Sequence, residues 1–195
     1  MSQAIQELFK EVRDCTYCDS TLPMGPRPIV RGGTGARICI IGQAPGIKVH
    51  KSGVPWSDQS GKRLRKWLQV DEETFYNENL IAIIPMGFCY PGTMENGADY
   101  PPPEECAPLW HATIFDVLNK IEFTLLVGSY AQAYYLRDKR KKSLTETVRA
   151  WQEYLPKFCP IPHPSWRTRS WQKNNMWFDE EVLPDLRTRV HDLLR

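Results

Sequence analysis

The sequence predicts an α/β protein with a three-layer α/β/α architecture around a central parallel sheet of four strands. Short apolar runs occur at 37–42, 80–84, 123–128 and 158–161, the first of them rich in β-branched residues, and such runs are typical of buried parallel strands. Helical patterns separate them, and alternating strands and helices favour a parallel sheet that is covered on both faces. A chain of 195 residues suits one sizeable core, so we expect a single domain over 1–195.

The N-terminal third is expected to hold one helix, one long loop and the first strand. Ile5, Leu8, Phe9 and Val12 have the spacing of an apolar helix face, which predicts a helix over 2–13. Residues 22–35 are rich in proline and glycine and read as a loop that follows the surface. The run at 37–42 ends in glycine and is the first predicted strand.

The later helices are recognised by their starts and by their apolar faces. Leu64, Trp67 and Leu68 share one side of a helix predicted over 60–68, and prolines and acids open another over 103–119. Ser143 to Glu146 match a capping box. Further helices are expected at 129–136, 143–154 and 179–194, the last interrupted early by Pro184. Residues 91–103 should form a long ordered loop, and such loops are often functional.

Composition indicates a cytoplasmic protein that does not enter membranes. The N-terminus is polar and charged and lacks the apolar centre of a secretory signal. No apolar run approaches the ~20 residues that span a bilayer. Six cysteines in such a chain suggest metal binding or buried thiols rather than disulfides, and Cys39 and Cys159, inside predicted strands, are expected in the core. We expect a monomer.

Positive charge is clustered although the formal net charge is only +2. Basic clusters occur at 62–66 and 137–142, and Arg167, Arg169 and Lys173 lie close together late in the chain. Clustered basic residues suit the phosphate backbone of a nucleic acid. Solvated helix faces and a basic loop would explain the same clusters, and both interpretations stay open.

Four of the cysteines are candidates for one inorganic site. Cys15 and Cys18 form a C-x-x-C pair, whereas Cys89 and Cys106 lie far along the chain. Four thiolates that converge on one point bind a metal ion or an iron–sulfur cluster. Two disulfides or four unrelated thiols are the alternative. Zinc sites more often use two closely spaced pairs, and here the second pair is widely split.

Three further motifs follow the predicted strands in order. They are GQAPG at 42–46, GVPWSDQSG at 53–61 and HPSW at 163–166. Together they resemble the uracil-DNA glycosylase superfamily, and within it the iron–sulfur family 4 branch with its family 5 relatives. That branch carries G-E-x-P-G, then G-x-P-F-x-G-x-x-G, and a final motif that begins His-Pro. The four cysteines also occur in the order of that branch's cluster ligands, and the resemblance spans nearly the whole chain.

This resemblance implies a DNA-repair glycosylase that hydrolyses the N-glycosidic bond of a flipped, deaminated base in DNA, with uracil as the expected base. It also implies DNA as the partner. The resemblance favours a [4Fe–4S] cluster over zinc as the cofactor, held by Cys15, Cys18, Cys89 and Cys106.

The resemblance also implies roles for individual residues. His163 would donate a hydrogen bond to the carbonyl oxygen of the leaving base, and Gln43 would line the pocket or position water. Trp56 would stack on the base, at a position where the branch usually has phenylalanine. The remaining residues implied to bind the base or DNA are Gly42, Ala44, Pro45, Gly46, Ser165, Arg167 and Arg169.

Two departures from the branch pattern concern catalysis and base selection. Gln43 stands where the family 4 motif has glutamate, and Pro85 stands where an asparagine reads the uracil edge. An alternative is therefore a cluster-containing nucleic-acid-binding protein of the same fold without glycosylase activity. An enzyme that acts on another base or nucleoside is a third possibility. His50 and Asp58, the latter within the second motif, lie in the loop after the first predicted strand and are additional candidates.

Overall fold

The computed structural model describes residues 3–195 and has a central parallel sheet of four strands, which confirms the predicted fold class. The strand order is β2-β1-β3-β4. The strands are β1 (Ile38–Ile41), β2 (Ile81–Ile83), β3 (Phe123–Val127) and β4 (Phe158–Ile161), close to the four predicted runs. All neighbours pair in parallel, with Ile38 opposite both Ile81 and Phe123.

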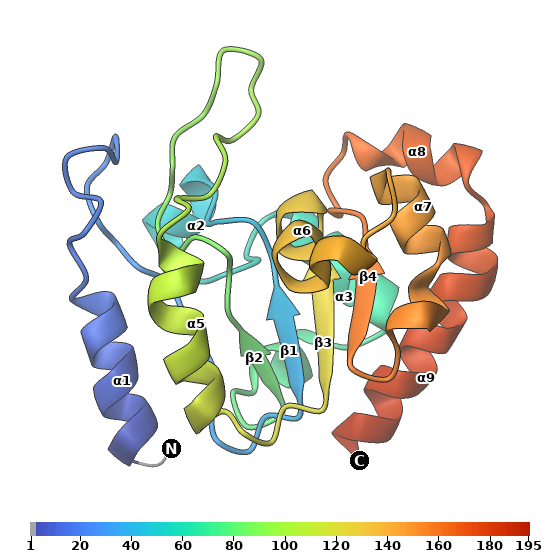
Figure 1. Cartoon of the computed structure of the whole chain (residues 1–195), viewed down its shortest axis with the longest axis horizontal. Helices are drawn as coiled ribbons and strands as arrows, with labels where there is room; N and C mark the ends of the chain where they lie inside the picture. The colour runs from blue at the N-terminus through green and yellow to red at the C-terminus, as the bar shows by residue number, and fades with distance from the viewer. Residues whose placement is uncertain (1–2) are drawn as a thin grey trace.

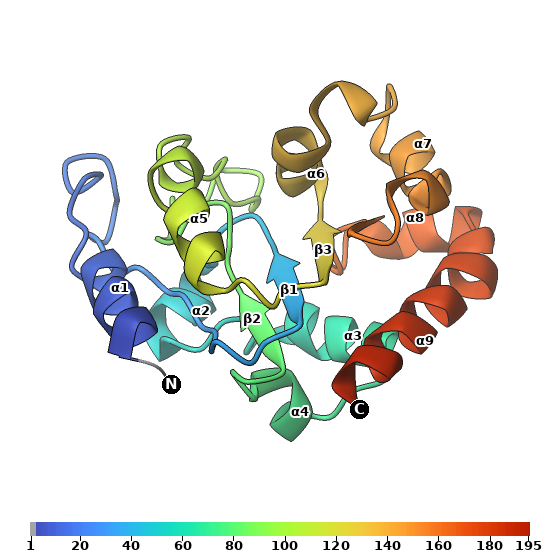
Figure 2. The same cartoon turned by 60° about the horizontal axis from the view of Figure 1, so that its bottom comes forward.

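Helices cover both faces of the sheet (Figure 2). On one face lie α1 (Gln3–Arg13), α5 (Cys106–Val117) and α6 (Ser129–Leu136). On the other lie α3 (Gln59–Leu68), α4 (Glu72–Tyr76), α7 (Leu144–Arg149) and α9 (Leu183–Leu194). Alternate residues of one strand therefore enter different cores: Ile38 and Ile40 pack with α3 and α9, whereas Cys39 and Ile41 pack with α1 and α5.

Helix α1 shows how the sequence pattern produces the packing. The four apolar residues that predict it are all buried, and the helix packs against α5. Full burial of such side chains stabilises the fold by roughly 1.5–3 kcal/mol each. Residue 2 of the predicted helix lies outside the described residues. Cys39 and Cys159 are fully buried, as predicted.

Strand β4 tolerates a proline because it lies at an edge of the sheet. It pairs with β3 alone, and Pro160 lies opposite Leu126. Proline has no N–H to donate to a ladder, and the unpaired side of an edge strand does not need one.

Several local elements differ from the prediction. Two short helices, α2 (Ile47–Ser52) and α8 (Thr168–Asn174), occupy segments for which no helix was predicted. The helix predicted over 143–154 is α7 followed by a 3-10 turn at Trp151–Tyr154, although its capping box at Ser143 is confirmed. A π-helical turn at Phe178–Val182 precedes α9, so Pro184 lies in the first turn of α9 and does not interrupt it.

The segments that carry the sequence motifs gather at one end of the sheet. Figure 1 shows α2, α8 and the long segment between β2 and α5 at the end toward which β1 points. The carboxyl ends of parallel strands are the usual site of ligand binding in such folds. Among the described residues, no helix is long and apolar enough to cross a membrane.

Candidate functional site

A cavity of about 350 Å³ opens at the carboxyl ends of the strands. Segments that follow β1, β2 and β4 line it, together with part of the 91–103 loop. Its lining includes the predicted site residues Gly42, Gln43, Ala44, Pro45, Gly46, Trp56, His163, Ser165 and Arg167. Arg169 is exposed on α8 and does not line the cavity. A volume of this size can hold a nucleobase.

The 42–46 turn continues the sheet beyond β1. The backbone N–H of Met86 donates to the Gly42 carbonyl oxygen and that of Gly87 to the Gln43 carbonyl oxygen, both at 2.9 Å. A Cβ placed on Gly42 would lie 2.8 Å from the Trp56 ring. Glycine is therefore required at 42 for the indole to pack against the turn.

Trp56 is held in an unusual backbone conformation at the wall of the cavity. Its φ is 56°, in the left-handed region that few bulky residues adopt. A Cβ placed on Gly61, in the first turn of α3, would lie 1.7 Å from the Trp56 carbonyl oxygen. The close approach of α3 therefore depends on glycine at 61.

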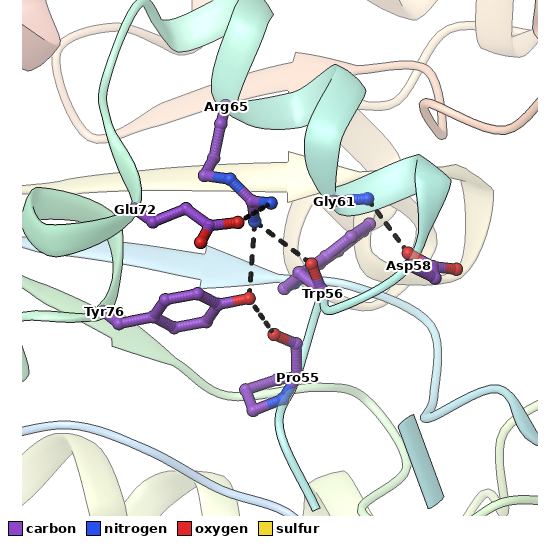
Figure 3. Close-up of polar contacts among 7 residues, drawn as sticks. All are labelled: Pro55, Trp56, Asp58, Gly61, Arg65, Glu72 and Tyr76. Carbon is purple, nitrogen blue, oxygen red and sulfur yellow. Dashed lines mark hydrogen bonds and ion pairs between the residues drawn. The ribbon is translucent and has the colours of Figure 1, made fainter. Parts of the chain in front are cut away.

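Arg65 fixes the backbone of Trp56 (Figure 3). Its guanidinium donates to the Trp56 carbonyl oxygen at 3.1 Å and forms an ion pair with Glu72 at 2.7 Å. The Tyr76 hydroxyl also accepts from Arg65 and donates to the Pro55 carbonyl oxygen at 3.0 Å. The network connects α3 and α4 to the segment that carries Trp56.

Two arginines of the 62–66 basic cluster therefore have internal roles. The Arg65 side chain is only 7% exposed, so it cannot contact a phosphate backbone and is not a solvated residue. Arg63 donates to the Ser165 carbonyl oxygen and to the Thr168 hydroxyl, and its guanidinium lies over the Trp67 ring. Charge clustering in a sequence does not distinguish these contacts from DNA contacts.

His163 lies across from the 42–46 turn and beside Trp56. The centroids of the two rings are 5.5 Å apart and the ring planes are tilted by 31°. The Thr168 hydroxyl donates to the His163 carbonyl oxygen at 2.6 Å and fixes the backbone there. Burial lowers the pKa of His163 to about 4, and nearby Asp58 opposes this shift. The imidazole is therefore neutral at pH 7 and carries one N–H donor.

The 91–103 loop is tied to the cavity from two sides. The Gln43 side-chain amide donates to the Tyr100 carbonyl oxygen at 2.9 Å, and the Arg167 guanidinium donates to the Asn96 carbonyl oxygen at 2.9 Å. The loop thus joins the first and the last sequence motif and places Gly97 to Asp99 in the cavity wall.

A family model of the uracil DNA glycosylase superfamily matches residues 30–187, which include all the residues that line the cavity except Ile29. The chain belongs to the uracil DNA glycosylase superfamily. The match begins after Cys15 and Cys18 and is to the superfamily as a whole, so membership of the iron–sulfur branch stays a prediction.

This superfamily member also has cavity residues outside the set to which the resemblance gives roles; Asp58, in the second motif, was an additional candidate, whereas Asp99 was not. Asp58 and Asp99 both line the cavity, and Pro85 lies there too, without a side-chain donor or acceptor. Asp99 had no sequence signal except its place in a loop expected to be functional. His50 is buried and lies outside the cavity wall, and its carbonyl oxygen accepts from Arg27.

A buried histidine supports the Pro85 segment. The Pro85 carbonyl oxygen can only accept, so His111 Nε2, at 3.0 Å, must carry the proton. His111 Nδ1 then accepts from the Tyr135 hydroxyl at 2.6 Å. Burial lowers the pKa of His111 to about 4, so this network uses the neutral imidazole.

The four predicted cluster cysteines line a second, small cavity between α1 and α5. Cys15, Cys18, Cys89 and Cys106 all contribute to it, and the six cysteines are free thiols. Burial is the largest cause of the raised pKa of Cys89, about 11, and of Cys106, about 12. Within residues 3–195, no group of three or more His, Cys, Asp or Glu side chains is arranged to hold a metal ion.

Proposed function

We propose that this protein is a DNA glycosylase that hydrolyses the N-glycosidic bond of a deaminated base, with uracil as the first candidate. The observation that carries the proposal is the single cavity in which the glycine-proline turn, Trp56 and His163 meet. Superfamily membership supports the same activity. The target nucleotide must leave the helix to enter such a cavity.

In this proposal the Trp56 indole is the stacking surface for the flipped base. Stacking of a base on an aromatic side chain contributes roughly 1–3 kcal/mol and tolerates different bases. Trp56 is fixed by Arg65 and Gly61 before any DNA arrives. A surface that is already in place loses little conformational entropy on binding.

His163 would stabilise the leaving base. As the C1′–N bond breaks, its electron pair moves onto the base, and negative charge develops on a carbonyl oxygen of the ring. The neutral imidazole has one N–H to donate to that oxygen. A preorganised donor of this kind typically contributes a factor of about 10²–10³ in rate.

The segment after His163 is suited to gripping DNA at the rim of the cavity. Trp166 is 70% exposed, and the Arg167 guanidinium lies 5.2 Å from its ring centroid. An exposed aromatic residue can fill the space that a flipped base leaves, and the arginine can contact phosphate. Arg169, exposed on α8, would contact the backbone further from the base.

A second candidate function is DNA binding without cleavage. Pro85 favours it, because proline in the cavity wall offers no side-chain group to read a base edge. Gln43 favours it as well, because an amide cannot accept a proton from water and this amide is engaged with Tyr100.

Oligonucleotides distinguish the two functions. Single- and double-stranded DNA carrying uracil, hypoxanthine or xanthine is incubated with the protein and then treated with alkali, which breaks the strand at abasic sites. Strand breaks that disappear in His163→Ala but persist in His191→Ala, an imidazole on α9 outside the cavity, support the enzyme. DNA binding without breaks on any substrate supports the second candidate.

We also propose that the four cysteines hold a [4Fe–4S] cluster. The donor set fits, because four thiols line one cavity and such clusters take four cysteine ligands. Zinc sites more often use two closely spaced pairs of ligands, whereas Cys89 and Cys106 are widely split in the sequence. When bound, the cluster would be structural and would cross-link α1 to the loop before α5.

The test of this cofactor is spectroscopic. Protein purified without oxygen should be brown, with broad absorption near about 400 nm that is typical of thiolate-bound iron–sulfur clusters. Iron and sulfide should be present in equal amounts and should be lost in Cys106→Ala but not in Cys39→Ala, a buried thiol outside the cavity. Colourless protein with one zinc per chain would contradict the proposal.

A further inference from the structure

Hydrolysis of a glycosidic bond needs a group that takes a proton from water. In the proposed reaction the water oxygen bonds to C1′ as the bond to the base breaks. The amide of Gln43 is not basic, and the neutral His163 is assigned to the base. The carboxylates that line the cavity, among the described residues, are Asp58 and Asp99.

Asp58 already has a structural use. Its Oδ1 accepts from the backbone N–H of Gly61 at 3.0 Å and caps the start of α3 (Figure 3). Such a cap satisfies one of the unpaired N–H groups of the first turn and stabilises the helix. Its Oδ2 accepts no hydrogen bond among the described residues, but the Asp58 carboxylate raises the pKa of His163 and is therefore coupled to the residue assigned to the leaving base.

Asp99 has one oxygen fixed and the other available. Its Oδ1 accepts from the Thr93 hydroxyl at 3.0 Å. Within the part of the chain that the structure describes, no hydrogen bond or ion pair reaches Oδ2. A Cβ placed on Gly46 would lie 3.3 Å from Oδ2, so this oxygen lies against the 42–46 turn.

Hydrogen bonds in the 91–103 loop hold Asp99 at this position. The Tyr90 and Thr93 hydroxyls are 2.7 Å apart, and because Thr93 donates to Asp99, Tyr90 donates to Thr93. At the next residue along the chain, the Tyr100 carbonyl oxygen accepts from the Gln43 side-chain amide. The glutamine that replaces the family 4 glutamate therefore helps to position a carboxylate from another loop.

We propose that Asp99 is the carboxylate that orients the attacking water and accepts its proton, in place of the motif carboxylate that this chain lacks at 43. The assignment rests on the proposed glycosylase function. In the step, the C1′–N electron pair leaves with the base and a lone pair of the water oxygen forms the C1′–O bond. One proton of that water passes to Asp99 Oδ2, and the departing base leaves as an anion that His163 stabilises.

The surroundings of Asp99 suit a base of this kind. Burial raises its pKa, and the neighbouring Asp58 carboxylate acts in the same direction. The Thr93 hydroxyl and the Arg167 guanidinium act in the opposite direction and limit the shift. A carboxyl pKa above its ordinary value makes a stronger proton acceptor near neutral pH.

The experiment compares Asp99→Asn with Glu95→Gln under single-turnover conditions on a lesion that the wild-type protein cleaves. Glu95 is an exposed carboxylate of the same loop and does not line the cavity. Asparagine keeps an acceptor for Thr93, so the loop should stay in place. We expect the rate of Asp99→Asn to fall by about 10²-fold or more, with DNA binding within twofold of wild type. Glu95→Gln should retain the wild-type rate.

A pH profile separates a catalytic from a structural role. The wild-type rate should fall on the acid side as Asp99 becomes protonated, and the residual rate of Asp99→Asn should lack that acid limb. An unimpaired Asp99→Asn variant, or one that is slow but keeps the wild-type acid limb, would overturn the role of Asp99 and leave the proposed glycosylase function in place. A wild-type protein that cleaves none of the lesions would overturn the proposed function and this inference with it.

Discussion

At the scale of single residues, the cavity depends on Trp56, whose backbone lies in the left-handed region and whose carbonyl oxygen accepts from Arg65. Conformations of this kind cost free energy, roughly 1–3 kcal/mol, and persist only where the surroundings enforce them. The buried guanidinium and the close approach of α3 supply that enforcement. The indole is thus placed by contacts of its backbone and by the packing of its ring against Gly42.

The role of the Trp56 ring can be tested by two substitutions. Trp56→Ala should weaken binding of lesion-containing DNA by about 1–3 kcal/mol, or roughly 5- to 150-fold, because the stacking surface is lost. Trp56→Phe keeps an aromatic ring and should stay within about tenfold of wild type. Fluorescence anisotropy with DNA bearing a non-cleavable analogue of the lesion measures both. Equal binding by the alanine variant would contradict a stacking role.

His111 makes stability dependent on pH. Its folded-state pKa of about 4 lies below the unfolded value, so the unfolded chain binds the proton first as the pH falls. The stability that the neutral imidazole contributes is present above the unfolded pKa. It is lost as the pH falls toward 4.

Unfolding by urea at pH 7 and at pH 5 measures this effect. We expect His111→Gln to reduce the loss of stability between the two pH values by about 2 kcal/mol relative to wild type. The comparison uses the change with pH, because loss of the Tyr135 hydrogen bond lowers stability by about 1 kcal/mol at either pH. His191→Gln on α9 is the control. An unchanged pH dependence in His111→Gln would assign the acid sensitivity elsewhere.

At the scale of elements, α3 connects the core to the cavity. Its apolar residues Leu64, Trp67 and Leu68 pack against the sheet, whereas its first turn carries Gly61 and the Asp58 cap. Burial of the apolar face fixes the helix axis, so the first turn cannot move away from Trp56 without loss of core contacts.

Gly61→Ala tests this coupling. The added methyl group would overlap the Trp56 carbonyl oxygen, so either α3 or the Trp56 segment must shift. We expect a loss of about 3 kcal/mol in unfolding free energy, together with weaker binding of lesion-containing DNA. Lys62→Ala, an exposed position of the same helix, should keep the wild-type free energy of unfolding. Wild-type stability in Gly61→Ala would mean that the segment is free to move.

At the scale of the whole molecule, the sequence predicted the elements whose signals are local and repeated. The four strands are short apolar runs, and α1 has apolar residues at helical spacing. The pattern of apolar residues is therefore enough to identify these elements. Helices α2 and α8 are too short to show such a pattern, and α8 carries Arg169, which the resemblance implied to bind DNA. The 91–103 loop was expected to be ordered, but its conformation depends on distant partners.

The candidate site likewise contains residues that the sequence predicted and residues that it did not. The motifs indicated Gln43, Trp56 and His163, because each lies in a short pattern after a predicted strand. Asp99 and Arg65 were not identified. Asp99 is held by Thr93 of its own loop and by the bond from the distant Gln43 to the next residue, Tyr100, and no local pattern indicates either contact. Arg65 is buried within a run of basic residues that resembles a solvated face.

The proposed cluster should stabilise one part of the fold more than the rest. Helix α1 contacts the molecule through its apolar face and through the cavity of the four cysteines. Loss of the cluster in Cys106→Ala should therefore increase amide hydrogen exchange in α1 and in the segment around Cys89. The strands β1 and β3 should keep their protection. Uniform loss of protection, or no change in α1, would contradict this role.

In the proposed function, the fixed position of the Trp56 indole decides which molecule must rearrange when a nucleotide enters the cavity. Because the protein side is set in advance, nearly all the reorganisation belongs to the nucleic acid, which must break its own stacking and pairing to deliver a nucleotide. Weakly paired or unpaired lesions face the smallest barrier. Selection of damaged sites would then begin with weak base pairing at the lesion, before the base makes any contact with the cavity.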